Sequence, residues 1–209
     1  MTPFGGDADN SAHPTPRRGR PAKISADDVV ATAISLGIGT FRLSEVARTL
    51  NVTVQSVYRR YPTRSTLLEE CIDVALRTVP PISLLDPVPD TWENILRASS
   101  RQWWALCRRF PGWCTVITDY DGPLERFLDA GFGSYLESLL ALGWTQPQAR
   151  FSAALMVSTA ARIDHFVSQG TPPGETPATE TLAIAERQME EATEFIIAGL
   201  TVDRPDWTL

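Results

Sequence analysis

Apolar residues recur at helical spacing through most of the chain, and no segment alternates apolar and polar positions as a half-buried strand would. Three short helical patterns lie close together between Ser25 and Tyr61. Longer patterns follow, separated by prolines and glycines, and they predict helices over 65–79, 91–110, 123–142, 146–169 and 178–200. The expected fold class is therefore all-α, with a three-helix unit joined to a larger helical bundle.

The first two short helices have well-marked boundaries. Ser25 is a good N-cap, Asp28 is placed to complete a capping box with it, and Gly37 provides a stop. The second helix is predicted to start at about Arg42. Its apolar positions, spaced i, i+3, i+4 and i+7, are Leu43, Val46, Ala47 and Leu50.

The second and third short helices are separated by a turn of about three residues. Asn51 ends the second helix, because asparagine tolerates the left-handed backbone conformation. Thr53 is an N-cap for a third helix over Val54–Tyr61, which Pro62 closes. Two helices joined in this way predict a helix-turn-helix, the motif that places its second helix in the DNA major groove.

These patterns divide the chain into three parts. Residues 1–21 mix Pro, Gly, Asp, Ser and Arg with almost no apolar side chain, which predicts a flexible arm. Residues 22–79, here called the head, contain the motif at about 42–61. Residues 80–209, here called the body, carry the long helices and are expected to bind an effector and to dimerise.

Charge separates the head from the body. Between Arg17 and Arg64 the sequence has nine basic and three acidic residues, whereas the whole chain carries a net charge of −6. A basic end on an acidic remainder is typical of a protein that meets phosphates with one side only. The interaction expected from this asymmetry is with double-stranded DNA.

Composition restricts the compartment and the chemistry. No apolar run is long enough for a membrane span and the first residues do not resemble a secretory signal, so the expected location is cytoplasmic, with no membrane partner. Cys71, Cys107 and Cys114 form no CxxC pair, which favours small buried hydrophobes over a disulfide framework or a zinc site. No phosphate loop, metal motif or nucleophile elbow occurs, so neither enzyme activity nor a cofactor is expected.

The run from Phe41 to Leu68 resembles the DNA-binding segment of TetR-family transcriptional repressors. The residues that carry this resemblance are Val46-Ala47, Val52-Thr53, Val57-Tyr58, Tyr61 and Arg64. The resemblance is strong from about Arg20 to Leu76, and beyond that it extends only to the helical layout. The sequence departs from the family at three positions, with Asn51 where Gly is usual, Arg60 where His is common and Arg42 where a Ser or Thr cap is usual.

The last two predicted helices carry small residues and apolar stripes with more surface than one partner helix can cover, which suggests a four-helix bundle with a second copy. The stripe residues are Ala153, Ala154, Ser158 and Ala161 on one helix, and Leu182, Ala185, Met189, Ala192, Ile196 and Leu200 on the other. The resemblance implies that the homodimer forms in this way and that a helix from Ser65 transmits effector binding to the head. It also implies that the positions of Tyr58, Arg60 and Arg64 contact the DNA backbone. A symmetric dimer would read the two half-sites of a palindromic operator.

The third short helix supplies the candidates for reading bases. Val57 and Tyr61 are four residues apart and should face inward, so the opposite face is free to enter the major groove. There Gln55 can bind an adenine edge, Arg59 a guanine edge, and Val54 or Tyr58 a thymine methyl. The candidates for phosphate contacts are Arg42, Ser44, Ser56, Tyr58, Arg60 and Arg64. The alternative is a solvated helix face with no partner.

The arm contains Arg17-Arg18-Gly19-Arg20-Pro21. Arg18 and Arg20, held extended by Gly and Pro, could enter a narrow A·T-rich minor groove. A generic basic tail that only adds affinity is an equally good interpretation.

Aromatic side chains concentrate in the middle of the body, where they either fill the core or line a pocket for an apolar or aromatic effector. The candidate pocket residues are Trp103, Trp104, Trp113, Phe132, Tyr135, Phe151 and His165. His165 has no Ser, Cys or second His at a recognisable spacing, so it is not interpreted as catalytic or metal-binding.

The function expected from these observations is a transcriptional repressor that a small effector releases from its operator. Two alternatives remain. One is a DNA-binding regulator that responds to no effector, and the other is a helical small-molecule-binding protein whose basic head is incidental.

Overall fold

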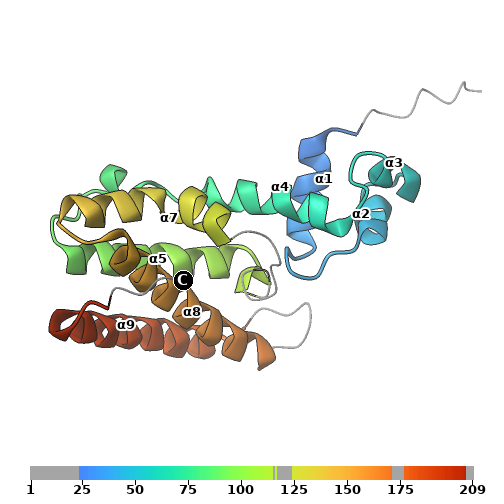
Figure 1. The fold of residues 1–209 in the computed structure, drawn as a ribbon. Coiled ribbons are helices and arrows are strands. Elements are labelled where there is room, and N and C mark those ends of the chain that lie inside the picture. The colour runs from blue at the N-terminus through green and yellow to red at the C-terminus, as the bar shows by residue number, and fades with distance from the viewer. Residues whose placement is uncertain (1–23, 115, 117–123, 171–176, 206–209) are drawn as a thin grey trace, which may run out of the picture.

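The computed structural model describes residues 24–114, 116, 124–170 and 177–205, without the side chains of 124–131 (Figure 1). Every regular element in this part of the chain is helical. The predicted all-α class is therefore confirmed for the described residues. The arm lies outside them.

Three short helices gather at one end of the molecule in Figure 1: α1 (Ala26–Ser35), α2 (Leu43–Thr49) and α3 (Val54–Tyr58). The longer α4 (Arg64–Leu76) runs from this group toward the body. Its buried side chains pack with those of the short helices into one core. The main contributors are Val29, Ala33, Phe41, Val46, Val57, Tyr61, Leu67 and Ile72.

The predicted signals at the start of α1 and at the ends of α1 and α2 are confirmed. Ser25 Oγ accepts a hydrogen bond from Asp28 N at 3.0 Å, and Asp28 Oδ2 accepts one from Ser25 N at 3.2 Å. These bonds hold the pKa of Asp28 below its usual value. Gly37 and Asn51 have positive φ angles of 99° and 53°, the left-handed conformation that lets the chain turn after α1 and α2.

Three helix boundaries in the head differ from the prediction. The third helix ends at Tyr58 instead of Tyr61, because the chain tightens after it and Arg60 N donates to Val57 O, only three residues back, at 3.0 Å. The helix expected to start with its own cap at Ser65 is instead capped by Thr63, whose hydroxyl accepts a hydrogen bond from Thr66 N at 3.2 Å. That helix ends at Leu76 instead of Val79, and a 3-10 turn, η1 (Ile82–Leu84), follows it.

The body consists of α5 (Trp92–Arg109), α7 (Leu124–Ala141), α8 (Gln146–Gln169) and α9 (Thr179–Val202). The predicted range of α8 is confirmed at both ends, and the other predicted ranges agree to within two residues. α5 packs against α7, α8 and α9, so it is the central helix of the body (Figure 1).

Polar contacts fix α9 against α5. Arg97 donates two hydrogen bonds to the carboxylate of Glu194, at 2.6 and 2.8 Å. The hydroxyls of Ser100 and Thr193 share a buried hydrogen bond of 2.6 Å. Beyond α9, the Arg204 guanidinium lies over two tryptophan rings, 4.9 Å from the centroid of Trp92 and 4.7 Å from that of Trp144. These contacts hold the C-terminal helix in one register on the body.

The head and the body meet where two glycines touch. Gly39 lies in the turn between α1 and α2, and Gly112 lies just after α5. A Cβ at Gly39 would stand 2.6 Å from Gly112 O, and one at Gly112 would stand 2.9 Å from Gly39 N. Gly112 also has a positive φ of 84°. The two backbones are therefore in direct contact, with no space for a side chain between them.

Candidate functional site

α3 is held by its cap and by one buried side chain. Thr53 Oγ1 accepts a hydrogen bond from Ser56 N at 3.3 Å, and the two hydroxyls lie 2.8 Å apart. Val57 is fully buried in the core of the head. A helix of five residues has little stability of its own, so this cap and this anchor fix its orientation.

The opposite side of α3 is exposed, as the sequence predicts. Val54 is 39% and Tyr58 48% exposed, and Gln55 and Arg59 are exposed beside them. These four residues are here called the α3 face. The face combines an amide, a guanidinium, a phenol and an aliphatic group, which can bind base edges and thymine methyl groups.

The turn before α3 is closed by backbone hydrogen bonds. Asn51 N donates to Arg48 O at 3.1 Å and Val52 N donates to Ala47 O at 3.0 Å. Both bonds return to α2, so the direction of α3 is set relative to α2 by the main chain.

Tyr61 provides an anchor that the sequence analysis found only as a packing residue. Its ring is buried and its hydroxyl donates to Glu70 Oε2 at 2.5 Å, which connects the end of the α3 region to α4. Burial, together with this bond, raises the pKa of Tyr61 to about 12. The nine-residue separation between donor and acceptor gives no periodic signal, so the sequence alone did not reveal the pair.

The candidate phosphate-binding residues fall into two groups. Arg42 and Ser44 are exposed at the start of α2, Arg60 is exposed next to Arg59 of the α3 face, and Ser56 is half-buried at the start of α3. Arg42 is the N-cap of α2 without a side-chain acceptor, and Glu45 Oε2 accepts its backbone N–H at 3.2 Å instead. The guanidinium of Arg42 is therefore not needed for the cap.

Arg64 differs from the others because its guanidinium serves the fold. Nε donates to Phe41 O at 3.1 Å, and Nη2 donates to Gly39 O at 2.7 Å and to Ile38 O at 3.4 Å. The group also lies 4.9 Å from the centroid of the Phe41 ring. Arg64 thus fastens the turn before α2 to the start of α4, and its contact with a phosphate stays a prediction. Arg18 and Arg20 lie outside the described residues.

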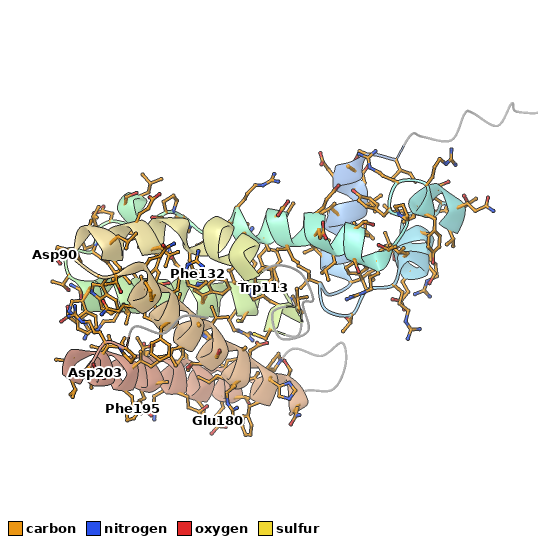
Figure 2. All side chains as sticks on the ribbon, in the orientation of Figure 1. Asp90, Trp113, Phe132, Glu180, Phe195 and Asp203 are labelled. Carbon is orange, nitrogen blue, oxygen red and sulfur yellow. The ribbon has the colours of Figure 1, made fainter. Side chains whose placement is uncertain are left out.

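Four of the candidate pocket residues form a packed aromatic cluster. The rings of Trp103 and Phe132 stack with centroids 4.4 Å apart, and Trp113 lies 6.2 Å from Trp103. Tyr135 meets Phe132 edge-on at 5.6 Å, and its hydroxyl lies 2.6 Å from Ser152 Oγ. Figure 2 shows Trp113 and Phe132 within the body. The structure brings these four rings together as core.

The remaining candidates lie at different depths. Trp104 is buried, and Phe151 is half-buried against the core. His165 is exposed on α8, where Nε2 lies 2.9 Å from Nε2 of Gln169. The structure therefore does not bring His165 to the aromatic cluster.

The last two helices expose apolar side chains that differ from those of the predicted stripes. In α9, Ala185, Met189 and Leu200 are buried within the protomer. The exposed residues are Phe166 on α8 and Ile184, Phe195 and Val202 on α9. Phe195 is 81% exposed and points away from the body in Figure 2.

The three exposed residues of α9 share one side of the helix. Ile184 and Phe195 are eleven residues apart, and Phe195 and Val202 are seven apart, which are close to whole numbers of helical turns. This row of three side chains is here called the α9 face.

Comparison of the sequence with models of known protein families gives no match, and comparison with curated protein sequences gives none either. No helix in the described ranges is both long and apolar enough to cross a membrane. Within the same ranges, no three His, Cys, Asp or Glu side chains are grouped as metal ligands would be.

Proposed function

We propose that the chain is a sequence-specific DNA-binding transcriptional regulator, with α2 and α3 as its helix-turn-helix. The observation that carries the proposal is the α3 face, where Gln55 and Arg59 are exposed together while Val57 anchors the other side. A helix that buries one side and exposes donors and acceptors on the other is suited to a major groove.

The surroundings of the α3 face support this proposal. Arg60 follows Arg59 directly and is exposed, and Arg42 is exposed at the start of α2, so both guanidinium groups can donate to phosphates. The acidic remainder of the chain would be repelled by DNA, so the head alone would approach the duplex.

The proposal includes a homodimer that covers the α9 face. Phe195 and Val202 are almost completely exposed, and large apolar side chains grouped on one helix favour burial against a partner. A second copy would bury both α9 faces around a two-fold axis and would set two heads on the half-sites of a palindrome.

The proposal also includes an apolar effector, which acts on the aromatic cluster. Trp103 and Phe132 are in stacking contact, so an effector would bind there by displacing rings. Tryptophan fluorescence should then change at the same effector concentrations that release DNA. If compounds alter the fluorescence and never the DNA affinity, the regulator acts without an effector.

The first experiment is selection of bound duplexes from random-sequence DNA, followed by measurement of affinity by fluorescence anisotropy. Arg59→Ala should weaken binding to the selected duplex by about 1 to 3 kcal/mol. Arg101→Ala is the matched control, because Arg101 is exposed on α5 and loses the same charge far from the α3 face. Failure to enrich any sequence, or equal losses in both variants, would contradict the proposal.

A further inference from the structure

Two of the three cysteines lie close together in the body. Cys107 is in the last turns of α5 and Cys114 follows the turn at Pro111 and Gly112. Their sulfur atoms are 3.0 Å apart, and each residue is only 3% exposed. The spacing of seven residues did not suggest this pairing, because it matches neither a CxxC motif nor a metal site.

We infer that Cys107 and Cys114 are a redox-active pair that hydrogen peroxide converts into an intramolecular disulfide. A disulfide has a sulfur separation of about 2.05 Å, so the two atoms need to approach by about 1 Å. The ring closed by this bond contains the eight residues 107–114.

The chemistry proceeds in two balanced steps. The thiolate of one cysteine attacks a peroxide oxygen, which breaks the O–O bond and gives a sulfenic acid and hydroxide. The second thiol then attacks the sulfenic sulfur, the S–S bond forms, and water leaves. Two thiols and one peroxide thus give one disulfide and two waters, and a dithiol reverses the reaction by exchange.

Cys114 has two polar neighbours, Cys107 and Asp164. The hydrogen bond with Cys107 and burial both raise the pKa of Cys114 above its usual range. These effects favour the protonated form of the Cys114 thiol. Asp164 of α8 is hydrogen-bonded to Cys114, which places a carboxyl group where it can accept the proton released in the second step.

The position of the pair connects it to the head. Gly112 lies within the eight-residue ring, and its backbone is in contact with that of Gly39. Since no space separates the two backbones, a contraction that shifts Gly112 must also disturb the turn at Gly39. The pair is thus placed where oxidation can change how the head is held, and this inference does not depend on DNA binding.

The first test is peptide mapping of the native protein after treatment with hydrogen peroxide. Trypsin cleaves after Arg108 and Arg109, between the two cysteines, so a disulfide would hold two peptides together until reduction. We expect this linked pair in the wild type and in Cys71→Ala, and its loss in Cys107→Ala and Cys114→Ala. Circular dichroism checks that each variant is folded.

The wild type alone decides the result if a variant fails to fold. Three unmodified thiols after peroxide treatment, or linkage through Cys71 or between chains, would overturn the inference. Because both cysteines are almost fully buried, a bulky maleimide should not label them in the reduced native protein.

The second test is amide hydrogen exchange in the reduced and the oxidised protein. The amides of Thr40 and Phe41 each donate to Gly37 O at 3.0 Å in the turn that touches Gly112. We expect severalfold faster exchange of these amides after oxidation, and no change in peroxide-treated Cys114→Ala. Unchanged exchange in a protein whose disulfide is demonstrated would overturn the connection to the head.

Discussion

The α3 face and the α9 face are both exposed rows of side chains, but they have opposite chemistry. The α3 face has hydrogen-bonding groups and a positive charge at Gln55, Tyr58 and Arg59, whereas the α9 face is apolar at Ile184, Phe195 and Val202. A polyanion such as DNA can accept the hydrogen bonds and neutralise the charge of the α3 face. Burial of the α9 face is favourable only against another apolar protein surface. Under the proposed function, the α3 face would meet DNA and the α9 face would meet a second copy of the chain.

The largest predicted effect comes from placing a charge on the α9 face. Phe195→Glu should convert a dimer into a monomer, because a carboxylate cannot be buried there without a partner. Loss of the second head should then weaken binding to a palindromic duplex by about a hundredfold or more. Light scattering measures the mass, and anisotropy measures the affinity.

Phe195→Leu is the control, since it keeps the α9 face apolar and should remain dimeric. A wild-type protein that is already monomeric at micromolar concentration would show that the α9 face serves another purpose.

Gln55→Ala tests whether Gln55 of the α3 face reads a base. The loss of a bidentate contact with adenine should cost about 1 to 3 kcal/mol on the selected duplex and little on random DNA. A repeated selection with the variant should show relaxed preference at one base pair of each half-site. A uniform loss of affinity on all sequences would remove Gln55 from the base-reading residues.

Tyr61→Phe tests how much the hydrogen bond between Tyr61 and Glu70, which lies behind the α3 face, stabilises the head. Removal of the hydroxyl that bonds Glu70 should lower the free energy of unfolding by about 1 to 2 kcal/mol. The pKa of Tyr61 is raised to about 12 in the folded protein. The stabilisation that the Tyr61 hydroxyl gives to the fold is therefore fully present below about pH 10 and is lost as the pH rises toward 12. Denaturant titrations over this pH range should show that the free energy of unfolding falls less steeply with pH in the variant than in the wild type.

Arg60→Ala should have the smallest effect. Loss of one phosphate contact should weaken binding to all duplexes alike and should reduce the slope of log affinity against log salt by about 1. Anisotropy measured at several salt concentrations gives the slope, with Arg101→Ala as the reference for a charge lost elsewhere. An effect confined to the selected sequence would move Arg60 from the phosphate group to the base-reading residues.

Much of the fold could be predicted because its signals are local. The capping box at Ser25, the left-handed turn at Asn51 and both ends of α8 each depend on residues within a few positions of one another. The same holds for the α3 face, because helical periodicity separates Val57 from Gln55 and Arg59 without reference to the rest of the molecule.

What could not be predicted depends on distant pairs. Arg64 bonds carbonyl groups more than twenty residues earlier in the chain, and Cys107 meets Cys114 only because the chain reverses at Gly112. The α9 face was also misjudged in detail, because an apolar stripe does not show which of its members the rest of the protomer covers. Ala185 and Met189 proved to be internal, while Phe195 is not.

The contact between Gly39 and Gly112 also limits how freely the head could be exchanged for the head of another protein. Here the joint has no space for even a methyl group on either side. A chimera that retains this body would therefore need a glycine at the position equivalent to Gly39, because a side chain there would displace the turn between α1 and α2.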